Sequence, residues 1–202
     1  PLARRLLASA LRRGEWPTRD STISPRWLAR IREALHIPAL ELLDRRVSPL
    51  DGFQKSLFAG PDGARFESVL IPLSNRPDAP KAVACVSSQS GCAMGCSFCA
   101  TGRLGLARNL APWEIVAQVA ALRHASPAPI TGVVFMGMGE PLLNYESVVR
   151  AASVIAEPSG LAIAAKSITL STVGIVPAIL RLAEKHRAFR LIISLTTTDP
   201  AK

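Results

Sequence analysis

Cys92-Ala-Met-Gly-Cys96-Ser-Phe-Cys99 is the most informative stretch of this 202-residue sequence. Its C-x3-C-x2-C spacing places three thiols within one short segment. A cluster of four irons needs an external ligand on each iron, so three cysteines leave one iron open, much as a catalytic zinc site keeps an open position. The segment therefore predicts an iron–sulfur cluster with one iron free for another molecule.

Zinc is the alternative occupant of the same segment. A zinc site normally uses paired C-x2-C units or histidines. The three histidines, His36, His124 and His186, fall in or beside helical segments away from the cysteines, whereas Cys85 could supply a fourth thiolate. A zinc-stabilised module without catalysis therefore stays open as a second interpretation.

The sequence around the cysteines alternates between strand and helix patterns. Apolar strand candidates at 82–86, 132–136, 167–171 and 190–195 are separated by amphipathic helices at 112–124, 145–156 and 176–186. This alternation predicts an α/β fold with parallel strands and right-handed crossovers, a partial (β/α) barrel. The cysteine segment and residues 137–141, 171–172 and 194–196 all follow strand ends, at the rim where such folds bind ligands.

The first 75 residues have a different pattern. Residues 2–13 form an amphipathic basic helix, and Ser24-Pro25 predicts the start of a second one. Residues 54–58 and 66–71 flank the turn sequence Gly60-Pro61-Asp62-Gly63, which predicts a β-hairpin. The hydrophobic pattern of residues 40–47 fits a helix and a strand equally well. We therefore expect a small helical and β-hairpin region over residues 1–75 and the incomplete barrel over residues 76–202.

The net charge of +9 predicts a polyanionic partner. Every basic residue among the first fifty is an arginine, the side chain whose planar fork best matches phosphate. RNA bound by shape and phosphate is therefore the expected partner of residues 1–75, although a solvated basic helix face would have the same composition. The arginines are Arg4, Arg5, Arg12, Arg13, Arg19, Arg26, Arg30, Arg32, Arg45 and Arg46.

The cysteine distribution and the hydropathy pattern indicate a cytoplasmic protein. All four cysteines lie within residues 85–99, which is not typical of a disulfide framework, and neither a membrane-spanning stretch nor a signal peptide is evident. The chain begins at Pro1, and four parallel strands cannot close a barrel. We therefore expect more chain after residue 202.

Several motifs together resemble the RlmN/Cfr family of radical S-adenosylmethionine (SAM) enzymes. This family methylates an adenine carbon, C2 in the RlmN branch, in large-subunit ribosomal RNA, and RlmN also acts on transfer RNA. The sequence is closer to the RlmN branch. The motifs are Glu67-Ser-Val-Leu-Ile-Pro72, the segment from Cys85 to Cys99, Arg108-Asn109-Leu110, Met136-Gly-Met-Gly-Glu-Pro-Leu-Leu-Asn144 and Thr169-Leu-Ser-Thr-Val-Gly174.

The resemblance implies two cofactors. Cys92, Cys96 and Cys99 would ligate a 4Fe–4S cluster, reduced by an external electron donor. S-adenosylmethionine would contact Gly139, Glu140, Ser171, Ser194, Leu195 and Thr196. The family usually has histidine at the position of Thr196, so imidazole contacts would be missing here while a hydroxyl remains.

The resemblance also implies two catalytic residues in a monomeric enzyme. In the family's reaction, a methylated protein cysteine becomes a carbon radical that adds to adenine, a base removes the ring proton, and a second cysteine releases the product as a disulfide forms. Glu67 matches the base and Cys85 the second cysteine. Without the resemblance, Glu67 would be a solvent-facing strand residue and Cys85 a small packed side chain.

One residue of that reaction is missing from the chain. The methyl-carrying cysteine lies in the family's final portion, together with a cofactor-binding asparagine, and no cysteine follows Cys99. The sequence therefore predicts an inactive fragment of a methyltransferase. A radical SAM enzyme of another reaction type is the remaining alternative.

Overall fold

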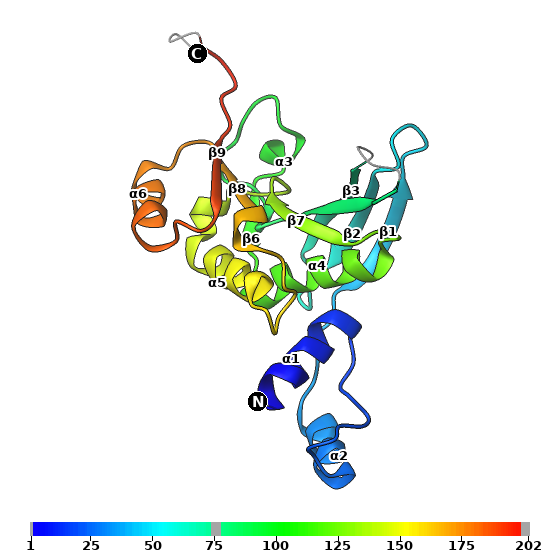
Figure 1. Ribbon diagram of the computed structural model, residues 1–202. Helices are drawn as coiled ribbons and strands as arrows, with labels where there is room; N and C mark the ends of the chain where they lie inside the picture. Colours follow the sequence, from blue (N-terminus) through cyan, green and yellow to red (C-terminus); the bar gives the residue numbers. More distant parts are fainter. Residues whose placement is uncertain (1, 74–77, 199–202) are drawn as a thin grey trace.

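One seven-stranded sheet organises the computed structural model, which describes residues 2–73 and 78–198 (Figure 1). Its strand order is β1-β2-β3-β4-β7-β8-β9. The first four strands are antiparallel neighbours, and β4, β7, β8 and β9 run parallel. The strands are β1 (Glu41–Val47), β2 (Gln54–Ala59), β3 (Arg65–Leu73), β4 (Lys81–Cys85), β7 (Ile130–Phe135), β8 (Ile168–Thr172) and β9 (Arg190–Ile193).

The parallel half of the sheet confirms the predicted partial barrel. Each predicted strand and helix is present within two residues of its expected bounds, and the helices connect successive parallel strands. Helices α4 and α5 lie together against one face of the sheet, and α6 lies beside β8 and β9 (Figure 1). These helices are α4 (Pro112–Ala125), α5 (Tyr145–Ala156) and α6 (Val176–Lys185).

The hydrophobic core lies between the sheet and helices α4 and α5. Strand β3 shows the two sides clearly, since Phe66, Ser68 and Leu70 are buried while the residues between them are half-buried. Alternation of this kind arises because successive side chains of a strand point to opposite faces. The half-buried face, which carries Glu67 and Val69, is here called the inner face.

The predicted β-hairpin is strands β2 and β3, and it is part of the same sheet as the barrel. Ala59 pairs with Arg65 across the turn, and β3 pairs with β4 through Val69 and Cys85. The ambiguous residues 40–47 form the edge strand β1. The predicted boundary between residues 75 and 76 lies outside the described residues, so the division into two regions stays a prediction.

Two helices precede the sheet and project away from it (Figure 1). They are α1 (Leu2–Arg13) and α2 (Pro25–Ala34), and the Ser24 hydroxyl caps α2 by accepting from the Trp27 amide. Helix α1 packs on α4, and the Arg12 Nε donates to the Gly160 carbonyl at 2.8 Å. Arg12 therefore attaches α1 to the barrel instead of facing solvent.

A small two-stranded ribbon was not predicted. Strand β5 (Gln89–Gly91) pairs antiparallel with β6 (Leu106–Asn109), and the short helix α3 (Ala100–Arg103) lies between them in the chain. The 3-10 turns η1 (Pro141–Asn144) and η2 (Ala165–Ser167) complete the structure. The ribbon is important because it frames the cysteine segment.

Candidate radical SAM site

The three clustered cysteines lie on a loop between β5 and α3. Cys92 follows β5, and its amide donates to the Gly105 carbonyl at 2.9 Å. The Cys99 amide donates to the Cys96 carbonyl at 3.0 Å, which curls the loop back on itself. All three thiols are free and half-buried, so they are accessible as metal ligands.

Glycines allow this loop to close tightly. Gly91 has φ +78°, and a β-carbon there would lie 1.9 Å from the Gly105 carbonyl oxygen. A β-carbon on Gly102 would come within 2.9 Å of the Cys96 backbone. Larger residues at either position would push the two sides of the loop apart.

The chemistry of the thiols fits an iron–sulfur cluster better than a single metal ion. Within residues 2–73 and 78–198, no three His, Cys, Asp or Glu side chains are grouped as they would be around one ion. The ligands of a cluster need no such grouping, because each thiolate binds a different iron. Cys85 is buried in β4, whereas the three half-buried cysteines lie together on the loop after β5.

A buried polar segment connects the loop to the parallel strands. Residues 87–90 follow β4, and all four side chains are at most 5 % exposed. The Ser87 hydroxyl donates to the Glu67 carbonyl at 2.6 Å and accepts from the Met138 amide. Gln118 of α4 accepts from the Ser87 amide at 2.8 Å and from Ser68 at 2.6 Å.

Gln89 links this segment to the predicted cofactor-binding loop after β7. Its Oε1 accepts from the Glu140 amide at 2.8 Å, and its Nε2 donates to Asn109 at 2.7 Å. Gly139 has φ +98°, and a β-carbon there would lie 2.5 Å from the Gln89 side chain. Gly139 therefore makes room for Gln89.

Glu140 joins the loops that follow β7 and β8. Its side chain is buried, and its two oxygens accept from the Leu142 and Val173 amides, each at 2.9 Å. The carboxylate thus caps η1 and holds the end of β8 at the same time. Carboxylate oxygens have further lone pairs, so a cofactor ammonium group remains a compatible partner.

Ser171 and Ser194 come together at the rim, as two of the predicted cofactor contacts. Their hydroxyl oxygens are 2.8 Å apart, and the Ser194 amide donates to the Thr172 carbonyl at 2.8 Å. Leu195 and Thr196 continue from there as exposed residues. The Gly139–Glu140 turn follows the parallel strand β7, Ser194 follows β9, and Ser171 lies in β8 one residue before its end. The cysteine loop follows β5, which comes after the parallel strand β4 in the chain.

Glu67 and Cys85 are brought to the same inner face by the strand register. Cys85 pairs with Val69 of β3 and with Val134 of β7, so these three side chains share one face. Glu67 lies two residues from Val69 and therefore points to that face as well. The pairs of Val134 with Thr169 and of Ser171 with Ile192 extend the face to β8 and β9.

The carboxylate of Glu67 forms an ion pair that the sequence did not predict. Lys55 of β2 places its Nζ 3.0 Å from Glu67 Oε1, and both side chains are partly exposed. Glu67 is thus a partly exposed strand residue, as its residue type suggested, but with a specific cationic partner. Burial raises the pKa of the Cys85 thiol, although a backbone hydrogen bond at Met136 acts in the opposite direction.

Sequence reasoning missed the polar residues that support the site, chiefly Ser87, Gln89, Gln118 and Lys55. A signal was present in the run Ser87-Ser-Gln-Ser90, because four polar residues directly after an apolar strand need hydrogen-bond partners if they are buried. Their partners come from distant elements, so spacing alone could not reveal them.

Comparison with known proteins identifies the class to which this geometry belongs. The family model of the radical SAM superfamily matches residues 86–201, which contain the cysteine loop and the rim. The chain belongs to the radical SAM superfamily. The cofactors of this superfamily are a 4Fe–4S cluster and S-adenosylmethionine, so both predicted cofactors are confirmed at the level of the family.

Several relatives of this chain are RNA methyltransferases by name. The chain is 47% identical over 99% of its length to a probable RNA methyltransferase of Anaeromyxobacter sp., of which it covers 58%. It is 44% identical over 89% of its length to the dual-specificity RNA methyltransferase RlmN of Syntrophobacter fumaroxidans, of which it covers 51%. The chain therefore spans about half the length of the curated relatives, and the predicted resemblance to RlmN is confirmed.

A solved structure shows the same fold. A radical SAM methyltransferase from Sphaerobacter thermophilus superposes with a TM-score of 0.79 at 38% identity. The match covers 96% of this chain and 57% of that protein. The predicted fold class, an α/β partial barrel preceded by a small helical and β-hairpin region, is thereby confirmed.

Proposed function

We propose that this chain is the amino-terminal part of a radical SAM methyltransferase that methylates C2 of adenine in large-subunit ribosomal RNA and transfer RNA. The observation that carries the proposal is the shared inner face of Glu67 and Cys85, next to a rim with three free thiols. A radical SAM enzyme of another reaction type would need neither residue there. We also propose that the reaction takes place in the cytoplasm, with a separate protein as electron donor.

The residues of the rim would hold the cofactors. Cys92, Cys96 and Cys99 would ligate the cluster, and Glu140, Ser171 and Ser194 offer oxygens to S-adenosylmethionine. When bound, the two cofactors supply the radical that an unactivated aromatic carbon requires. The protein's task is to keep these oxygens in place, which the Gln89 and Glu140 hydrogen bonds do.

The inner face would carry out proton transfer and product release. Glu67 would accept the adenine C2 proton, because its carboxylate is partly exposed and can reach a substrate held over the sheet. Cys85 would attack the sulfur of the methyl-carrying cysteine. The S–S bond would form as the bond between that sulfur and the carbon attached to adenine breaks, and this carbon would take the electron pair and a proton to become the product methyl group. Burial raises the pKa of the Cys85 thiol, which disfavours its thiolate form.

The methyl-carrying cysteine would come from chain beyond residue 202, because no cysteine follows Cys99. We therefore expect the 202-residue chain to bind cofactors but not to methylate RNA. Residues 1–75 would act as an RNA-binding accessory, since eight arginines described in this region have no hydrogen bond or ion pair through their guanidinium groups, namely Arg4, Arg13, Arg19, Arg26, Arg30, Arg32, Arg45 and Arg65.

The test is anaerobic reconstitution of the chain with iron and sulfide. We expect about four irons per chain with matching sulfide and a brown chromophore. Replacement of Cys92, Cys96 or Cys99 by serine should abolish the chromophore, whereas Cys85→Ser should keep it. A colourless protein that holds one zinc ion would refute the proposal.

The methyl transfer is tested in a protein extended to the full length of its relatives. Incubation with reductant, S-adenosylmethionine and ribosomal or transfer RNA should give 2-methyladenine, detected by mass spectrometry of nucleosides. Glu67→Gln should leave a covalent protein–RNA adduct, because the ring proton is not removed. Methylation by the 202-residue chain itself would contradict the assignment of the missing cysteine.

A further inference from the structure

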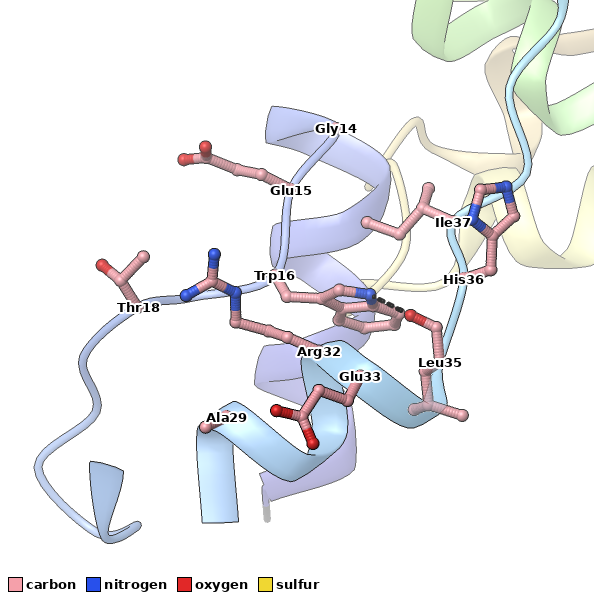
Figure 2. A pocket seen from close by; sticks show the side chains of 10 residues that line it. All are labelled: Gly14, Glu15, Trp16, Thr18, Ala29, Arg32, Glu33, Leu35, His36 and Ile37. Atoms are coloured by element: carbon pink, nitrogen blue, oxygen red, sulfur yellow. Dashed lines mark hydrogen bonds between the residues drawn. The ribbon is translucent and has the colours of Figure 1, made fainter. Parts of the chain in front are cut away.

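A cavity of about 630 Å³ lies outside the radical SAM site, between the α1–α2 connection and helix α2 (Figure 2). This volume falls in the range of ordinary ligand pockets, roughly 300–1,000 Å³. Its lining includes Trp16 from the connection and Arg32 and Glu33 from α2. None of these residues takes part in the site described above.

Trp16 gives the cavity a fixed aromatic wall. Its Nε1–H donates to the Leu35 carbonyl oxygen at 2.8 Å, the bond drawn dashed in Figure 2. The ring is half-buried, so part of its surface remains open to the cavity. A tryptophan held in this way presents a flat stacking surface without a further loss of side-chain entropy on binding.

The polar side chains around Trp16 are available to a ligand. Arg32, Glu33 and Thr18 are exposed, and their side chains make no hydrogen bond or ion pair with any residue in the described part of the chain. Arg32 and Glu33 are neighbours in the sequence, yet they do not pair with each other. In Figure 2 the Arg32 side chain extends away from the indole, toward the side of Thr18. The lining of the cavity thus includes an indole ring for stacking, a guanidinium that donates hydrogen bonds and a carboxylate that accepts them.

These groups match an unpaired nucleobase. Single-stranded RNA is bound by stacking bases on aromatic rings and by hydrogen bonds to their edges. A guanidinium donates to ring nitrogens and carbonyls, and a carboxylate accepts from exocyclic amines. Arg13 and Arg19 flank the cavity residues in the sequence and could contact the neighbouring phosphates.

We propose that the Trp16 cavity binds an unpaired base of the RNA substrate. The inference rests on the proposed RNA methyltransferase function, and it assigns to the α1–α2 region a base-binding role in addition to phosphate contacts. Its location away from the rim means that the bound base is not the methylated adenine, but one that helps to position the RNA.

The test compares two RNA probes bound to the 202-residue chain. One is a single-stranded oligoribonucleotide of about twelve nucleotides, and the other has the same backbone with abasic positions. We expect Trp16→Ala to weaken binding of the first probe about tenfold and to leave the abasic probe unchanged. Arg32→Gln should lower the affinity for the first probe roughly threefold or more.

Matched variants separate a binding effect from misfolding. Trp16→Phe keeps an aromatic ring and should retain most of the affinity, even though it lacks the hydrogen bond to Leu35. Trp27→Ala removes the other tryptophan of this region, which is 58% exposed and lies outside the cavity. This variant should bind both probes with unchanged affinity. Circular dichroism on each variant verifies that the helices remain.

The outcomes distinguish the inference from the proposed function. Equal affinity of the wild-type chain for both probes would overturn base binding and leave the RNA substrate standing. An equal loss of affinity for both probes in the Trp16→Ala variant would also overturn base binding by the cavity. Absence of binding to either probe would count against the RNA-binding role of residues 1–75 itself.

Discussion

Cys85 and Glu140 show how strongly the surroundings of one residue change its chemistry. Cys85 is a predicted catalytic residue, and Glu140 is a predicted contact of S-adenosylmethionine. In the structure, Cys85 is buried on a strand with a raised pKa, and Glu140 is buried between two backbone amides. Each residue therefore has a structural environment that can be tested without any cofactor.

Cys85 should be the slowest cysteine to react in the cluster-free chain. Its thiol is 8 % exposed with a raised pKa, so at neutral pH less thiolate is present and reagents reach it poorly. Alkylation with iodoacetamide followed by peptide mass spectrometry should label Cys92, Cys96 and Cys99 at least about tenfold faster. Because the pKa is raised, labelling of Cys85 should increase as the pH is raised above neutral.

In denaturant, all four cysteines should react at similar rates, since burial is lost. If Cys85 reacted in the native chain as fast as Cys99, its burial and raised pKa in the structure would be wrong.

Glu140→Gln should destabilise the chain although it changes only one oxygen to nitrogen. The amide nitrogen cannot accept a hydrogen bond, so either the Leu142 or the Val173 amide loses its partner inside the protein. A buried unsatisfied amide costs about 1–3 kcal/mol of unfolding free energy. Urea unfolding measures the loss, and hydrogen exchange at Val173 should accelerate.

Glu146→Gln is the matched control, because Glu146 forms only an exposed ion pair with Arg181. Exposed pairs contribute about 0–1 kcal/mol. Similar effects of the two substitutions would show that the Glu140 carboxylate does not connect the two loops.

At the level of elements, one arginine joins three parts of the chain. Arg108 of β6 contacts Asp62 in the β2–β3 turn, with Nη2–Oδ1 at 2.7 Å, and Glu114 in the first turn of α4, with both Nη atoms at 2.8 Å. The ribbon that frames the cysteine loop is thereby fixed to the hairpin and to a helix. Hydrogen bonds from Arg108 and from the turn lower the pKa of Asp62 to about 2.

Arg108→Met should destabilise the protein by about 3 kcal/mol. The substitution leaves the Glu114 carboxylate without its cation, although this side chain is only 2 % exposed. Asp62→Asn should cost much less, because Asp62 is on the surface. Chemical unfolding of both variants gives the comparison, and the double variant Arg108→Met/Glu114→Leu should recover much of the loss.

Acid unfolding supplies a second readout for the same contact. The pKa of Asp62 is lower in the folded chain than its ordinary value of 3.8, so the ionised Asp62 contributes fully to the free energy of unfolding above about pH 3.8. This stabilising contribution should be lost as the pH falls from about 3.8 towards about 2. Asp62→Asn should remove this part of the pH dependence, and an unchanged acid profile would contradict the ion pair.

The whole molecule combines a basic helical region with a barrel half whose inner face is open. The net charge of +9 and the unpaired arginines of residues 2–47 suit a polyanion. No helix among residues 2–73 and 78–198 is long and apolar enough to cross a membrane.

RNA binding by the chain should depend steeply on salt. If three or more arginines contact phosphates, the slope of log affinity against log salt is about −2 or steeper. Affinity should then fall by a factor of about 20 or more between about 50 and about 200 mM salt, measured by fluorescence anisotropy. Arg26→Gln should make the slope shallower by about one unit, and a salt-independent affinity would contradict phosphate contacts.

Local patterns in the sequence were sufficient for the helices, the parallel strands, the cysteine loop and the family. Periodicity determines these elements because each depends on residues close in the chain, and the C-x3-C-x2-C spacing already places three thiols on one loop. The proposed catalytic roles of Glu67 and Cys85 came from the resemblance alone.

Only the tertiary structure decided which distant residues meet. The pairing of β3 with β4 placed Glu67 and Cys85 on one face, and the pairing of β2 with β3 brought Lys55 to Glu67. Gln89, Gln118 and Arg108 find partners up to 51 residues away. The physical reason is that strand register and buried hydrogen bonds are set by the packing of the whole sheet, which no local pattern encodes.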